Sequence, residues 1–147
     1  MQKSYDRIIV IGATGSGKTT FGRALAARSG CAFIDLDDLY WLADGQARAP
    51  AIIWLDYPLV LVFRRLLARS LRRIWDKTPV CNGNTESLRN LLSKDSILLW
   101  LFRSYWRHRR SYAAIFADTG LYPDADYIRF TSPAAAEKWL RHLPVAG

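Results

Sequence analysis

Short apolar runs, each bounded by polar or turn-forming residues, recur along the chain. The runs at 6–12, 31–36, 51–56 and 126–130 each predict a strand. The first is continuously apolar from Ile8 to Ile11, as is typical of a parallel strand buried on both faces. These runs therefore predict a sheet whose strands are far apart in the sequence.

Helical periodicity fills the intervals between these runs. Gly30 is typical of the end of the first helix, and Pro133, which follows Thr131 and Ser132, is typical of the first turn of the last. Alternating strands and helices predict an α/β fold of three layers around a mostly parallel sheet. The expected helices are 18–29, 58–75, 88–117 (as one or two helices) and 133–143.

The loop between the first strand and the first helix has the spacing G-x-x-x-x-G-K-[ST], the P-loop or Walker A pattern. Glycines let backbone amides approach an oxyanion closely, and the helix N-terminus adds partial positive charge. Lys18 would reach the β- and γ-phosphates of ATP, and the Thr19 hydroxyl would bind Mg²⁺. The expected nucleotide-binding residues are Gly12, Ala13, Thr14, Gly15, Ser16, Gly17, Lys18, Thr19 and Thr20.

Acidic residues follow two of the predicted strands, at the sheet edge where α/β folds bind ligands. Asp35, Asp37 and Asp38 come at the end of the second run, and Asp37 is the candidate to hold Mg²⁺ or to accept an acceptor hydroxyl's proton. Helix capping is the alternative for Asp37 and Asp38. Asp56 ends the run at 51–56, where it could support Mg²⁺ as a Walker B aspartate does, or cap the next helix.

The composition fits one domain with a substantial core. The chain has 147 residues, of which 50% are hydrophobic, and no apolar run approaches the ~18 residues of a membrane span. The two cysteines, Cys31 and Cys81, have no metal or redox spacing, so a reducing cytoplasm is the expected setting. The turn-rich residues 76–87 begin a possible lid-like excursion over 76–96.

The formal charge of +8 is concentrated in the middle of the chain. Residues 64–110 hold twelve of the 21 Lys and Arg residues and only three acids. Such a region attracts polyphosphate, nucleic acid or an acidic membrane surface, although a solvated basic face is the alternative. His108 lies within this cationic run and is interpreted as a surface residue. One stripe comprises Arg65, Arg69, Arg72 and Arg73, and a second comprises Arg103, Arg107 and Arg110 among Trp100, Tyr105, Trp106 and Tyr112.

These motifs resemble those of adenylate kinase and its small P-loop relatives. The P-loop, the Leu36-Asp37 step and the segment from Leu55-Asp56-Tyr57-Pro58 to Arg69 are similar, and 82–91 is similar to the topology-modulation, nucleoside- and nucleotide-kinase-like group. The resemblance implies an ATP-dependent kinase in which Arg65 lies near adenine and Arg69 near the phosphates. It also implies that Arg103 or Arg107 corresponds to the arginines after the lid, and that Asp56 is largely structural.

The chain departs from that group in one segment. Its members carry a few dozen residues between the Leu-Asp-x-Leu-x-Trp segment and the Leu-Asp-x-Pro strand, whereas only 42–50 separates Trp41 from Ala51 here. The resemblance therefore implies a shortened acceptor site and one missing strand.

Two functions follow from these patterns. The first is phosphotransfer from ATP to a nucleotide or another small acceptor, with Lys18, Arg65, Arg69 and Asp37 as the catalytic residues. The second is an ATP-binding protein of weak catalytic power that engages nucleic acid through the basic, aromatic-rich helices. The sequence leaves the oligomeric state open.

Overall fold

A parallel sheet of three strands forms the middle layer of the structure. The computed structural model describes residues 8–33, 50–76, 79–80, 84–85, 97–118 and 123–143. The strand order is β1-β2-β5, and every residue of β2 is buried. Among the described residues, β1 pairs with β2 alone. The strands are β1 (Ile8–Gly12), β2 (Ala51–Leu55) and β5 (Asp126–Phe130).

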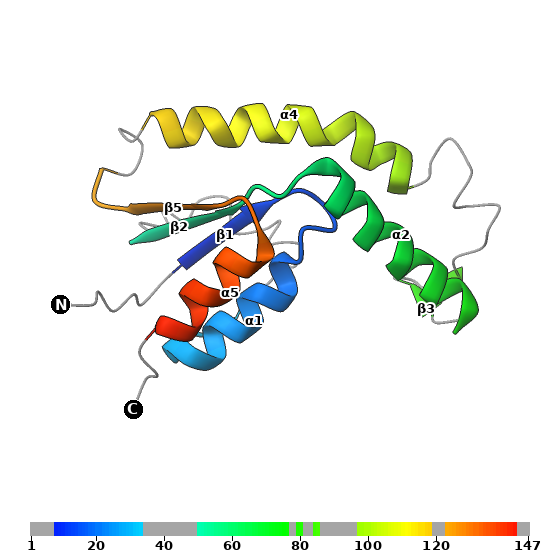
Figure 1. Cartoon of the computed structure of the whole chain (residues 1–147), viewed down its shortest axis with the longest axis horizontal. Coiled ribbons are helices and arrows are strands. Elements are labelled where there is room, and N and C mark those ends of the chain that lie inside the picture. Colours follow the sequence, from blue (N-terminus) through cyan, green and yellow to red (C-terminus); the bar gives the residue numbers. More distant parts are fainter. Residues whose placement is uncertain are drawn as a thin grey trace.

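Helices cover both faces of this sheet (Figure 1). Helix α4 crosses one face, and α1 and α5 lie together on the other. On the first face, the Trp54 ring meets Tyr112 and Phe116 of α4 edge-on. The expected three-layer α/β fold is therefore confirmed. The helices are α1 (Lys18–Ser29), α2 (Leu59–Trp75), α4 (Ile97–Ala117) and α5 (Pro133–His142), and a short antiparallel pair joins β3 (Pro79–Val80) to β4 (Asn84–Thr85).

The opposite face is held by aromatic contacts and by one arginine. Phe130 of β5 packs against Phe21 of α1 and Trp139 of α5, with ring centroids 6.3 and 5.6 Å apart. At the far ends of these helices, Arg28 donates hydrogen bonds to the carbonyl oxygens of Arg141 and Leu143 at 2.9 and 3.1 Å. The two helices on this face therefore pack as a pair.

Helix α2 begins directly after β2 and carries the first arginine stripe. Its buried positions are Val62, Leu66 and Ser70, spaced four residues apart, and its arginines lie mostly on the exposed faces. Phe63 is only half-buried and packs against Phe102 of α4, with ring centroids 5.4 Å apart. The helix is therefore amphipathic, as expected, with its buried face centred on Leu66.

The predicted strand at 31–36 is wrong where the structure describes it. Residues 31–33 belong to no strand, and 34–36 lie outside the described residues. Gly30 ends α1 in the left-handed conformation, with φ of 74°. The Phe33 ring then packs over Gly22, where an added Cβ would lie 2.8 Å from a ring carbon, and Arg23 covers the same ring. Phe33 therefore packs against α1, and residues 31–33 take no part in the sheet.

The last helix begins as its sequence predicts. Ser132 is its N-cap, and its side-chain oxygen accepts a hydrogen bond from the backbone N–H of Ala135 at 3.3 Å, with Pro133 in the first turn. Within the described part of the chain, no helix has the length and apolar character that a membrane span requires. Most of the lid-like excursion at 76–96 lies outside the described residues, so its role stays a prediction.

Leu66 provides a test of the core. Replacing this fully buried side chain by alanine should lower the free energy of unfolding by about 2–5 kcal/mol, because lost burial and a residual cavity both destabilise the protein. Leu71→Ala is the matched control on the same helix, since Leu71 is 44% exposed and its truncation should cost less than about 0.5 kcal/mol. Urea denaturation measures both values, and equal losses would contradict this packing.

Candidate nucleotide site

The loop from Gly12 to Lys18 has a conformation that its glycines make possible. Gly15 and Gly17 have φ of 82° and 93°, which is strained for any residue with a Cβ. A Cβ added to Gly12 would lie 2.7 Å from Ser16 Oγ and 3.0 Å from the carbonyl oxygen of Leu55. The loop is thus packed tightly against the end of β2, and the motif's spacing has a direct steric cause.

Helix α1 begins at this loop, and no acidic side chain of its first turn occupies its N-terminus. Its N-cap, Gly17, provides no side-chain cap, and the first turn contains no acidic residue. The first backbone N–H groups of a helix lack partners within the helix, and the helix dipole makes that end partially positive. The strand–loop–helix unit therefore has the properties of an anion site for phosphate.

The Lys18 side chain folds back over the loop. Its Nζ donates hydrogen bonds to the carbonyl oxygens of Gly12 and Ala13, at 3.0 and 3.1 Å. These contacts hold the ammonium group beside the loop that the sequence assigns to phosphate. Thr19 and Thr20 follow in the first turn of α1, and both are exposed.

One arginine of the first stripe reaches the loop from α2. Arg65 Nη1 donates a hydrogen bond to the Ser16 carbonyl oxygen at 3.2 Å, and the guanidinium lies 5.5 Å from the centre of the Tyr57 ring. Arg69 is exposed one turn further along the helix. The structure therefore brings Lys18 and Arg65 together across 47 positions of sequence, whereas Asp37, Asp35 and Asp38 lie outside the described residues.

Asp56 has a different role from either one that its local sequence suggested. Its side chain is 2% exposed, and Arg109 and Arg129 both bind it. Arg109 Nε donates to Oδ1 at 2.8 Å, and Arg129 Nε donates to Oδ2 at 3.0 Å. Both carboxylate oxygens are therefore occupied by arginines, and α2 begins after Pro58 without a side-chain cap. The capping interpretation of Asp56 is wrong, and its contacts agree with the structural role that the resemblance implied.

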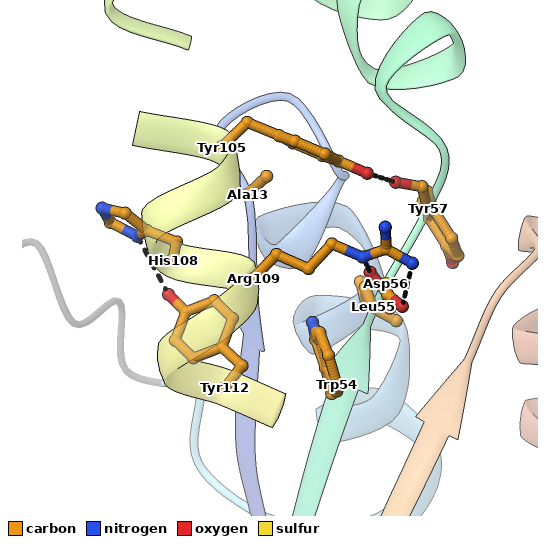
Figure 2. A pocket seen from close by; sticks show the side chains of 9 residues that line it. All are labelled: Ala13, Trp54, Leu55, Asp56, Tyr57, Tyr105, His108, Arg109 and Tyr112. Atoms are coloured by element: carbon orange, nitrogen blue, oxygen red, sulfur yellow. Dashed lines mark hydrogen bonds and ion pairs between the residues drawn. The ribbon is translucent and has the colours of Figure 1, made fainter. Parts of the chain in front are cut away.

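A small cavity lies between the P-loop and α4 (Figure 2). From α4, the Arg109 side chain extends to Asp56, while the Tyr105 hydroxyl donates to the Tyr57 carbonyl oxygen at 2.8 Å. These contacts hold the helix over the ends of β1 and β2. The cavity is lined by Ala13, Trp54, Leu55, Asp56, Tyr57, Tyr105, His108, Arg109 and Tyr112.

His108 lines this cavity, so its interpretation as a surface residue is incomplete. It is half-buried, and its Nδ1 lies 3.3 Å from the Tyr112 hydroxyl. Burial lowers the pKa of His108, and the positive charges of Arg107 and Lys18 lower it further. Burial also raises the pKa of Tyr112, so its hydroxyl stays protonated and can donate to a neutral imidazole. The surroundings of His108 therefore favour the neutral form of its imidazole.

The sequence does not mark the α4 residues of this cavity as members of one site. Their spacing along the helix is the signal that could have identified them. Tyr105, His108, Arg109 and Tyr112 recur at i, i+3, i+4 and i+7, which is the pattern of one helical face. Among the described residues, no group of three or more His, Cys, Asp or Glu side chains could hold a metal ion. At the loop itself, Thr19 provides a hydroxyl oxygen, a donor suited to Mg²⁺ when phosphate oxygens complete the set.

The sequence model of the family described as shikimate kinase matches residues 14–108, which is more than half of the chain. The chain belongs to the shikimate kinase family. Membership of this family agrees with the expected small P-loop kinase superfamily, while the match does not point to the topology-modulation group within it.

A curated relative supports the same family over a shorter stretch. Shikimate kinase 2 of Sodalis glossinidius (strain morsitans) is 44% identical over 45 residues, which cover 31% of this chain. The match spans about a quarter of that relative's own length, 26%. No solved structure matches the chain significantly.

Lys18 provides the test of this site. Replacing it by alanine should weaken the binding of a non-hydrolysable ATP analogue by about tenfold or more, because a charge-assisted contact to phosphate is lost. Lys138→Ala is the control, since Lys138 is an exposed lysine on α5. Isothermal titration calorimetry measures both affinities, and an unchanged affinity of the Lys18→Ala protein would exclude the loop as the phosphate site.

Proposed function

We propose that this protein is an ATP-dependent phosphotransferase, which transfers the γ-phosphate of ATP to a hydroxyl group of a small acceptor. The observation that supports it most is the convergence of Lys18 and Arg65 on the glycine loop, each within hydrogen-bond distance of loop carbonyl oxygens. Family membership provides independent support. Phosphoryl transfer depends chiefly on positioning and charge stabilisation, and such a loop supplies both.

In this proposal each residue has a defined task. The loop amides and Lys18 bind the β- and γ-phosphates, and Arg65 stabilises the charge that spreads over the transferred group. Arg69, one turn away on the exposed side of α2, contributes positive charge to the same region.

Mg²⁺ would be held by the Thr19 hydroxyl together with phosphate oxygens. Thr19 is exposed at the start of α1, beside the loop, so its position fits this task. Asp56 cannot contribute a ligand, because Arg109 and Arg129 occupy its carboxylate. Asp37 is the candidate for a carboxylate ligand or for orienting the acceptor hydroxyl. Bound Mg²⁺ supplies neutralisation of the phosphate charge.

The proposed acceptor is shikimate. The reason is the name of the family and of the curated relative, both of which are shikimate kinases. A nucleotide acceptor is the second candidate, as the motifs shared with adenylate kinase suggest. Neither comparison points to nucleic acid. The two arginine stripes alone are not enough to support nucleic-acid binding as the function.

Arg65 provides the test of phosphotransfer. With ATP and Mg²⁺, formation of ADP should depend on shikimate, and Arg65→Ala should lower kcat by about a hundredfold, because transition-state charge loses one of its donors. Arg64→Ala is the matched control, since Arg64 is the exposed neighbour on the same helix. A coupled assay for ADP measures both.

The acceptor arms of this assay separate the parts of the proposal. Stimulation by a nucleoside monophosphate in place of shikimate would keep phosphotransfer and replace the acceptor. ADP formation that no acceptor stimulates, or that Arg65→Ala leaves unchanged, would overturn phosphotransfer by this site.

A further inference from the structure

A second cavity lies between α4 and the β2–β5 side of the sheet, and it shares the Arg109 and Trp54 side chains with the cavity beside the P-loop. Its volume is about 280 Å³, and Trp54, Trp106, Arg109, Arg110, Ala113 and Arg129 line it. Ligand cavities in proteins typically measure about 300–1,000 Å³. This cavity is therefore just below that range, which suits a small ligand such as one nucleotide.

The charge of this cavity is strongly positive. The lining contains Arg109, Arg110 and Arg129 and no acidic residue. Arg109 and Arg129 share one carboxylate, that of Asp56, so the three arginines exceed it by two positive charges. Asp56 itself is buried, while the side chains of Arg109 and Arg129 are 41% and 46% exposed. The charged side chains that a ligand could reach at this cavity are therefore the arginines and not the carboxylate.

The two inner arginines are already ordered. Each donates to Asp56 through Nε and Nη2. A guanidinium carries five N–H donors, and within the described parts of the chain Nη1 of each arginine has no hydrogen-bond partner, so it can donate to a ligand. Arg129 is also stacked over the Trp54 ring, 4.5 Å from its centre. Groups fixed in this way lose little conformational entropy when they bind an anion.

Trp106 adds an aromatic surface at the rim of the cavity. Its side chain is 52% exposed, and the Arg109 guanidinium lies 6.0 Å from its ring centre. Exposed tryptophan beside arginine is the combination that stacks a flat ring and binds an attached phosphate. The cavity thus presents an aromatic surface next to an anion site.

We propose that this cavity binds a phosphate monoester that carries a flat aromatic ring, of which a nucleoside monophosphate is the example. The phosphate contacts Arg109, Arg110 and Arg129, and the ring stacks on Trp106. A phosphate monoester carries a charge of about −1.5 to −2 at pH 7, which matches the two unbalanced positive charges. This site is separate from the P-loop, and the proposal does not depend on the proposed phosphotransfer.

The experiment uses the full chain carrying Lys18→Ala, so that binding at the P-loop is weakened. AMP and ribose 5-phosphate are titrated by calorimetry, because they share a phosphate and differ in the aromatic ring. Trp106→Ala should weaken AMP by about fivefold or more and leave ribose 5-phosphate unchanged, since stacking of one base is lost. Arg110→Ala should weaken both ligands by a similar factor, since both lose the same phosphate contact.

Arg141→Ala is the control, because Arg141 is an exposed arginine of α5 outside the cavity lining. Its affinities should equal those of the parent protein. The affected side chains are exposed, and circular dichroism checks that each variant is folded. No measurable binding of AMP, equal effects of Trp106→Ala on both ligands, or an Arg141→Ala loss as large as that of Arg110→Ala would each overturn the proposal.

Discussion

A buried carboxylate joins the three parts of the structure that meet above the sheet. Asp56 ends the central strand, Arg109 comes from α4 and Arg129 from β5, and both arginines bind the same side chain. The carboxylate itself is buried, so these two arginines supply the compensation that water would otherwise provide. These contacts therefore fix α4 across the ends of the strands, and the Tyr105 hydroxyl adds a further contact to the Tyr57 carbonyl oxygen.

The position of α4 determines what the P-loop faces. The loop conformation itself is set by glycines and by contact with the end of β2. His108 and Tyr112 of α4 line the small cavity beside the loop, and Arg109 of the same helix holds α4 in place by binding Asp56. A helix turned by one residue would present Trp106 or Arg110 there instead. The ion cluster thus shapes the nucleotide site without belonging to it.

The arginines of the basic region have different roles in different parts of the structure. Arg109 compensates a buried carboxylate, Arg65 reaches the P-loop, and Arg110 is exposed at the rim of the second cavity. A count of charges along the sequence treats these residues as one basic region. The structure separates them, because adjacent positions on a helix point about 100° apart.

Local patterns in the sequence were sufficient for most of the fold. The three strands of the sheet, the helices after Lys18 and Pro58, and the cap at Ser132 all depend on neighbouring residues, and their prediction is confirmed. The apolar run at 31–36 has the same composition as a strand, but packing of Phe33 on Gly22 decides its path. Short apolar runs leave this choice to tertiary contacts.

The candidate site also contains residues that local sequence predicts and residues whose roles depend on distant partners. The P-loop is one continuous motif, so its residues were predictable from spacing alone. The roles of Asp56 and His108 depend on partners up to 73 positions away along the chain, and one sequence contains no signal for such pairs. Asp37 lies outside the described residues, so its role stays a prediction.

The most direct test of this account is a crystal structure of the protein with a non-hydrolysable ATP analogue and Mg²⁺. The account predicts the triphosphate in the loop, with Lys18 Nζ moved from the carbonyl oxygens of Gly12 and Ala13 onto the phosphates and with Asp56 still bound to Arg109. An empty loop, or a triphosphate bound elsewhere with Lys18 still on those carbonyl oxygens, would contradict it.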